Sequence, residues 1–126
     1  MNQELFLRAQ MLERDSSELE ERLNLVNQEI VELQNFDINL GRINDSEEKE
    51  ILASLGKGIF IKSEIKDKDL FVNVGSNILV KKTPEEAKKV ISGQIERLGQ
   101  IAEEISKQIL YINKELEEIV KKFEEK

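Results

Sequence analysis

The sequence predicts an α+β fold in which a long antiparallel two-helix coiled coil is joined by two β-hairpins. Apolar residues repeat every seven positions in residues 1–43 and again in residues 84–126, whereas residues 44–83 alternate with a period of two. Only 5% of the 126 residues are aromatic and 36% are charged, which is too little material for a thick globular core. We therefore expect a single domain with a helix at each end and a β region between them.

Residues 1–43 carry an apolar stripe over six heptads of a predicted coiled coil. The positions three residues earlier are polar or small near the amino terminus and apolar only around Leu23 and Ile30, so we expect the helix pair to loosen toward that end. Gly41, Asn44 and Asp45 are expected to stop the helix. The stripe is Leu5, Leu12, Leu19, Val26, Leu33 and Leu40, and the earlier positions are Asn2, Ala9, Ser16, Leu23, Ile30 and Asp37.

Residues 44–83 predict two β-hairpins in tandem. Strands are expected at residues 50–55 and 59–66, joined through Gly56, Lys57 and Gly58, and at residues 70–74 and 78–82. The second turn, Gly75-Ser76-Asn77, contains Gly and Asn, which tolerate positive φ.

Four short strands leave open edges and apolar surface, so we expect hairpins of several chains to assemble into an oligomeric, barrel-like β core. The alternative is that the inward-facing strand residues form only the internal core of one chain. The residues expected to make contacts between chains are Ile59, Ile61, Ile65, Leu70, Val72, Val74, Ile78 and Val80.

Residues 84–126 predict the second helix. Thr83 is a capping residue, Pro84 suits the first helical position and Glu86 completes a capping box. Each helix has roughly 40 residues and a length of about 60 Å, and an antiparallel return brings both ends of the chain together, far from the β region. The second apolar stripe is Ile91, Leu98, Ile105, Ile112 and Ile119, with partners at Ile95, Ala102, Ile109, Leu116 and Phe123.

Composition excludes several classes of function. The net charge is −7, divided as −5 in residues 1–43 (nine acids, four bases), zero in residues 44–83 (seven of each) and −2 in residues 84–126 (ten acids, eight bases). This balance argues against binding of nucleic acid. No stretch is apolar enough to span a membrane, and residues 1–6 lack a signal-peptide pattern, so a cytoplasmic location is expected.

No residue is assigned to catalysis, to a cofactor or to a metal, because the chain has no Cys and no His. We interpret the glutamates at 103–104 and at 115, 117 and 118 as a solvated helix face. Gly56-Lys57-Gly58 is interpreted as a hairpin turn, since it lacks the spacing of a P-loop. The lysines at 81, 82, 88 and 89 form a small basic cluster that could dock an acidic partner or be ordinary surface charge.

The order helix, double hairpin, helix resembles the prefoldin family of ATP-independent chaperones, in particular its alpha subunit. Residues 55–62 carry part of this resemblance, with Leu-Gly-Lys-Gly before an apolar strand. The more specific part is residues 72–76 running into residues 80–87, which read Val-Lys-Lys-Thr-Pro-Glu-Glu-Ala. The resemblance implies assembly of two alpha subunits with four beta subunits into a hexamer.

The resemblance also implies that unfolded clients are held at the coiled-coil tips and delivered to a group II chaperonin. The alternatives are a frayed helix end with no such role and, for the whole chain, a self-assembling coiled-coil scaffold or filament; an enzyme is a distant third reading. The expected client-binding residues are Leu5, Phe6, Leu7, Met11 and Leu12 from the first helix and Val120 and Phe123 from the second.

Overall fold

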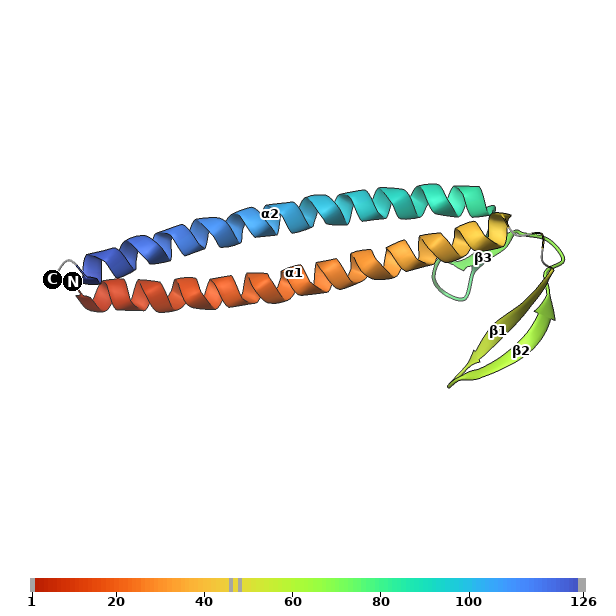
Figure 1. Ribbon diagram of the computed structural model, residues 1–126, viewed down its shortest axis with the longest axis horizontal. Helices are drawn as coiled ribbons and strands as arrows, with labels where there is room; N and C mark the ends of the chain where they lie inside the picture. The colour runs from red at the N-terminus through yellow and green to blue at the C-terminus, as the bar shows by residue number, and fades with distance from the viewer. Residues whose placement is uncertain (1, 46, 48, 125–126) are drawn as a thin grey trace. The chain divides into compact units, whose positions relative to one another are not determined.

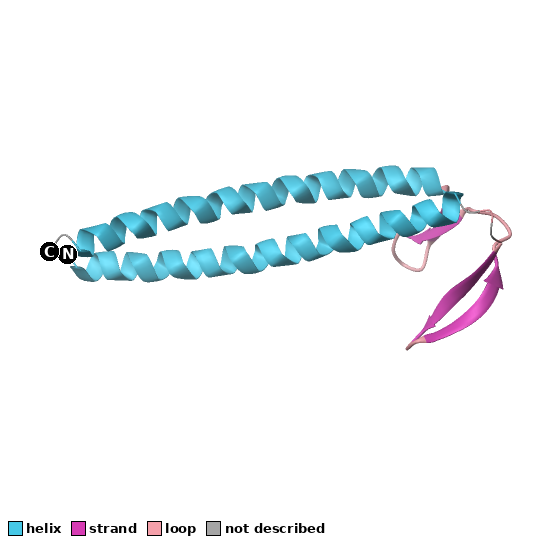
Figure 2. Ribbon diagram, viewed as in Figure 1, coloured by secondary structure: helices cyan, strands magenta, loops and turns pink. Residues whose placement is uncertain are grey.

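The computed structural model describes residues 2–45, 47 and 49–124 and contains two long helices with two β-hairpins between them in the sequence (Figures 1 and 2). This arrangement confirms the predicted coiled-coil and hairpin fold. The chain forms two compact units: residues 1–32 with residues 95–126, and residues 33–94. The elements are α1 (Asn2–Asp45), β1 (Glu50–Gly56), β2 (Ile59–Glu64), β3 (Leu70–Asn73), β4 (Leu79–Lys82) and α2 (Pro84–Glu124).

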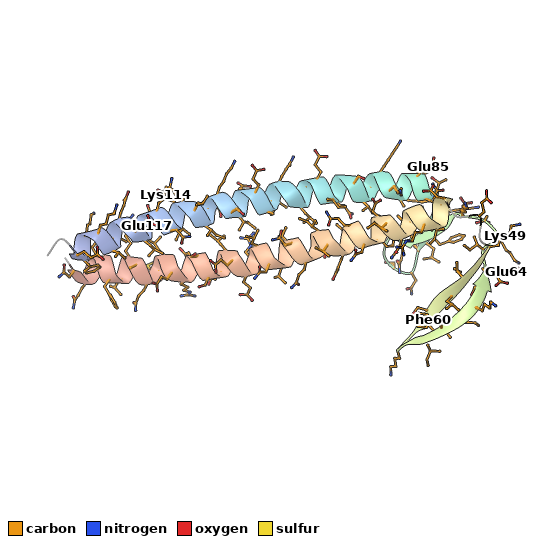
Figure 3. All side chains as sticks on the ribbon, in the orientation of Figure 1. Lys49, Phe60, Glu64, Glu85, Lys114 and Glu117 are labelled. Carbon is orange, nitrogen blue, oxygen red and sulfur yellow. The ribbon has the colours of Figure 1, made fainter. Side chains whose placement is uncertain are left out.

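The first unit is an antiparallel pair of helix segments. Figure 1 shows them side by side, and side chains from both helices fill the space between the ribbons in Figure 3. Apart from the two end positions, the predicted seam positions of both helices are half-buried or buried, with Ile105 and Ile119 only 4% and 5% exposed. Asn2 and Phe123, at the ends of the two stripes, are exposed. Because apolar side chains at heptad spacing meet along one line, burial in this unit follows the seam.

Ser16 is buried at 8% exposure, although it belongs to the weak part of the first stripe. A small side chain at a seam position lets the two helices approach closely, and its burial shows that the helices stay in contact there.

The second unit contains the last turns of α1, the first turns of α2 and both hairpins. Its core is small: Leu40, Pro84, Ala87 and Ile91 are the buried apolar side chains among its described residues. α1 continues through Gly41 and ends at Asp45. The Lys68 ammonium donates a hydrogen bond to the Asn44 carbonyl, which has no partner within the helix end.

The start of α2 has the predicted Thr83 cap. The backbone N–H of Glu86 donates to the Thr83 hydroxyl oxygen at 3.2 Å, and the N–H of Ala87 donates to the Thr83 carbonyl at 3.1 Å. Pro84 occupies the first helical position, where its missing N–H costs nothing.

The first hairpin pairs β1 with β2, and a register shift lies between Ser54 and Gly56. Its turn needs three consecutive positive φ angles, at Gly56 (105°), Lys57 (53°) and Gly58 (78°). Glycine adopts these angles without steric cost, which explains why two of the three residues are glycine.

The second hairpin pairs β3 with β4 as a separate two-stranded sheet. The turn at Gly75, Ser76 and Asn77 has positive φ throughout, and the N–H of Ile78 donates to the Gly75 carbonyl at 3.0 Å. This is the tight turn that the Gly-Ser-Asn sequence predicts.

Candidate interaction surfaces

An apolar surface lies at the end of the first unit where α1 begins and α2 ends; we call it the tip surface. Phe6, Leu7 and Met11 are 57%, 59% and 66% exposed, and Val120 and Phe123 are 52% and 38% exposed. Phe6, Leu7 and Phe123 line one shallow depression together with Asn2 and Gln3. The structure therefore brings side chains from both predicted arms together.

Two of the predicted client-binding residues differ from the rest. Leu5 and Leu12 are half-buried in the seam, because they are members of its heptad stripe. The other five are between 38% and 66% exposed, and all of them except Phe123, the last residue of the second stripe, flank the seam.

The first hairpin carries apolar side chains on both faces. Residues paired across an antiparallel ladder share a face, so Ile51, Ala53 and Ile61 lie on one face and Leu52 and Phe60 lie on the other. Ile61, Leu52 and Phe60 are 52%, 68% and 57% exposed. Figure 3 shows Phe60, which it labels, on this hairpin. Neither face is covered by the described part of the chain.

The second hairpin has one packed face and one open face. Leu70 and Val72 share the packed face and are half-buried, whereas Phe71 and Leu79 share the open face and are 65% and 60% exposed. The sequence analysis selected the first pair for contacts between chains and did not include the second. Strong alternation signals two faces but does not say which face the same chain covers.

The residues predicted to join chains therefore fall into two groups. Ile65, Leu70 and Val72 are already half-buried within the chain. The remaining residues are between 37% and 61% exposed and stay predicted contact residues; they are Ile59, Ile61, Val74, Ile78 and Val80. The hairpins also carry exposed large apolar side chains outside the predicted set, namely Ile51, Leu52, Leu55, Phe60, Phe71 and Leu79.

A small polar network crosses the seam in the first unit. Arg8 Nη2 donates to Glu115 Oε1 at 3.5 Å, and Glu115 also forms a hydrogen bond with the Tyr111 hydroxyl. That hydrogen bond, together with the negative charge of Glu115, raises the pKa of Tyr111 above its usual value. The sequence analysis assigned Glu115 to a solvated face; its pairing with Arg8 could be found only once the register of the two helices was known.

Two of the lysines of the basic cluster serve local structure. Lys81 Nζ lies 3.1 Å from Asp69 Oδ2, and this hydrogen-bonded pair raises the pKa of Lys81. The ammonium of Lys88 lies close to Gly41 of α1. These contacts favour ordinary structural roles for Lys81 and Lys88.

The described residues contain neither a metal-binding cluster nor a membrane-spanning helix. Across residues 2–45, 47 and 49–124, no group of three or more acidic, His or Cys side chains is placed to hold a metal ion. Within the same range, no helix is long and apolar enough to cross a membrane.

Comparison with known proteins identifies the family. Residues 12–126 match the prefoldin subunit family. The chain belongs to the prefoldin family. The chain is 33% identical over 95 residues to prefoldin subunit alpha of Thermofilum pendens, covering 74% of each chain. It is 26% identical over 80 residues to prefoldin subunit alpha of Methanosphaera stadtmanae, covering 64% of this chain and 58% of that relative.

A solved structure shares this prefoldin fold. The filamentous PFD of Methanocaldococcus jannaschii, determined by cryo-electron microscopy, superposes with a TM-score of 0.51 at 19% identity and covers 94% of this chain and 93% of that one. The family is one of chaperones, and both similar subunits are alpha subunits, in agreement with the alpha-type resemblance of the sequence.

Proposed function

We propose that this chain is the alpha subunit of an ATP-independent holdase that binds unfolded polypeptides at the tip surface and hands them to a group II chaperonin. The partners are prefoldin beta subunits, in a complex of two alpha and four beta chains. The whole chain acts as one prefoldin-type domain: a coiled-coil helix at residues 1–43, an assembly region at 44–83 and a second helix at 84–126. The absence of Cys is compatible with the cytoplasm, where we place it.

The observation that carries this proposal is the surplus of apolar surface at the tip. Ile119 is already buried in the seam nearby, so Phe6, Leu7 and Met11 are not needed to hold the helices together. Exposed apolar side chains gathered at one place mark an interaction site, and Met11 adds a flexible side chain that adapts to different partners. When the tip surface binds through apolar area alone, it can bind clients that have no sequence motif in common.

The hairpins support the assembly part of the proposal. Both faces of the first hairpin and one face of the second are apolar and uncovered, and each sheet has only two strands. A two-stranded sheet is marginal in water without further strands or a packed layer. Contacts with other subunits would cover these faces and edges.

A self-assembling scaffold or filament is the second candidate. The same uncovered hairpin faces could pair with copies of this chain alone, and the similar Methanocaldococcus jannaschii protein is itself filamentous. A heterologous contact that does not close into a ring gives an open filament. The two candidates differ in the size distribution of the assembly.

The holdase is tested by aggregation of a chemically denatured protein after dilution, followed by light scattering in the presence of the assembled complex. The double variant Phe6→Ser, Leu7→Ser should lose most of the suppression, because it removes the two exposed apolar side chains that α1 contributes to the tip depression.

The matched control is Leu25→Ser, Val31→Ser, which removes two apolar side chains of α1 that are 60% and 53% exposed but lie away from the tip. This control should keep suppression near that of the unmodified complex. Equal suppression by the tip variant and the unmodified complex would contradict client binding at the tip.

A further inference from the structure

A groove in the first unit lies on one flank of the helix seam. Leu19 of α1 and Ile112 of α2, both half-buried seam residues, contribute apolar lining, and Tyr111 lines it as an exposed aromatic side chain. The carboxylates of Asp15, Glu18 and Glu104 line it as well. We call it the Tyr111 groove; it shares no lining residue with the tip depression.

Tyr111 is 65% exposed and lies beside the ion pair of Arg8 and Glu115, which joins the two helices. Its hydroxyl forms a hydrogen bond with Glu115, and Glu115 is paired with Arg8 of the other helix at 3.5 Å. A positioned aromatic ring offers contact area while losing little conformational entropy on binding. The groove therefore combines an exposed aromatic ring and two seam residues with a mostly polar and charged lining.

The charges of the groove favour a cationic occupant. Arg22 and Lys107 also line it, but Lys107 pairs at 3.7 Å with Glu103, which lies outside the groove. Asp15 and Glu104 have no ion pair among the described residues. Glu18 likewise pairs at 3.4 Å with Arg14, which lies outside the groove, so two unpaired carboxylates face Arg22, which has no ion pair among the described residues.

The net charge of the first unit also favours a cationic occupant. Residues 1–32 and 95–126 carry sixteen acidic and nine basic residues, a net charge of −7, whereas residues 33–94 carry ten of each. All the net charge of the chain therefore belongs to the unit that holds the groove. Such a field raises the local concentration of cationic segments.

We infer that the Tyr111 groove is a second, charge-selective client contact, which binds extended unfolded segments whose apolar side chains are flanked by Lys or Arg. The inference rests on the proposed holdase function and names a client class for it. The tip depression is lined by Asn2, Gln3, Phe6, Leu7 and Phe123, without a charged side chain. The tip therefore supplies affinity without charge preference, and the groove supplies the preference.

The test uses the full chain and two labelled unstructured peptides with identical apolar residues, one with Lys and one with Glu at the intervening positions. Fluorescence anisotropy should show the Lys peptide binding about three- to tenfold more tightly at low salt. The difference should shrink at 1 M salt, where screening is effective beyond about 3 Å.

Asp15→Asn, Glu104→Gln should reduce the preference to less than about twofold, because it removes the two unpaired carboxylates of the groove. The matched control is Glu20→Gln, Glu117→Gln, which removes the same charge from exposed positions of the same unit outside the groove. The control should keep the preference.

If both variants lost the preference for the Lys peptide equally, the preference would come from the charge of the whole unit. That result would overturn the inference that the groove selects clients by charge. Equal binding of the two peptides by the unmodified chain would also overturn it, while leaving the holdase intact. Failure of both peptides to bind would contradict the holdase and the groove together.

Discussion

Glycine has two different roles in this chain, and the two roles predict opposite effects of the same substitution. Gly99 lies within α2, where a Cβ would meet no atom within 4 Å. Gly75 lies in the turn of the second hairpin with φ near 116°. Helices are destabilised by glycine, whereas a positive φ favours it.

We expect Gly99→Ala to raise the free energy of unfolding by about 0.5–1 kcal/mol, because alanine loses less backbone entropy in a helix. Gly75→Ala is the paired comparison and should lower the free energy of unfolding by about 1–3 kcal/mol through backbone strain. Urea denaturation followed by circular dichroism measures both. A destabilising Gly99→Ala would show that the helix packs more tightly there than the structure indicates.

Tyr111 provides a direct probe of the polar network, because it is the only tyrosine of the chain. The hydrogen bond to Glu115 raises its pKa, so spectrophotometric titration of the phenol should give a midpoint above about 10. Glu115→Gln removes the negative charge and should bring the midpoint back toward that value.

The sign of the linked stability follows from the raised pKa. The network's contribution is fully present below the pKa of the unfolded tyrosine and is lost as the pH rises through the higher pKa of the folded state. Stability from this source is therefore constant near neutral pH. An unshifted midpoint in the unmodified chain would contradict the hydrogen bond.

Single residues of the seam could be predicted from the sequence because a heptad position implies burial. Ile105 and Ile119 are buried as their positions predict. The Arg8–Glu115 pair and the Tyr111 groove could not be predicted, because both depend on how the antiparallel helices are aligned. A heptad pattern fixes which face of each helix is used, but it leaves the alignment along the axis open.

At the scale of the elements, the helix pair depends on a few strongly buried side chains. We expect Ile105→Ala to lower the free energy of unfolding by about 2–5 kcal/mol, since Ile105 is 4% exposed. Ile101→Ala, on the same helix and 42% exposed, is the matched control and should change stability much less. Thermal or urea unfolding measures the stability of both variants. Equal losses of stability would contradict the burial of Ile105 in the seam.

The hairpins could be predicted as elements, since alternating apolar residues and Gly-rich turns mark them clearly. Which face of each hairpin packs against the rest of the chain could not be predicted. In the second hairpin, Leu70 and Phe71 are neighbours of similar character, yet Leu70 is half-buried and Phe71 is 65% exposed. Two-sided apolar strands leave the choice of covered face to the tertiary structure.

The first hairpin supplies the assembly prediction. Ile59→Lys, Ile61→Lys places two charges on an apolar face and should abolish subunit assembly while leaving the helical circular dichroism signal. Glu64→Lys is the control, because Glu64 is paired with Glu50 on the other face and is already polar. Size-exclusion chromatography with light scattering measures the outcome. Normal assembly of the double variant would exclude this face as a contact.

At the scale of the whole molecule, the separation of charge matches the proposed division of labour. The unit that carries both hairpins has no net charge, whereas the unit that carries the tip surface has −7. A balanced assembly region avoids repulsion between subunits, and a charged client-binding unit stays solvated. The division into acidic ends and a balanced middle is visible in the sequence, but the assignment of residues 33–43 and 84–94 to the balanced unit required the structure.

The most direct test of the account is the native mass of the purified chain, alone and after mixing with a single-hairpin beta subunit from the same cell. We predict a small, defined oligomer that converts into a discrete hexamer of two alpha and four beta chains. An open distribution of sizes that ignores the beta subunit would contradict the heteromeric chaperone and favour the filament.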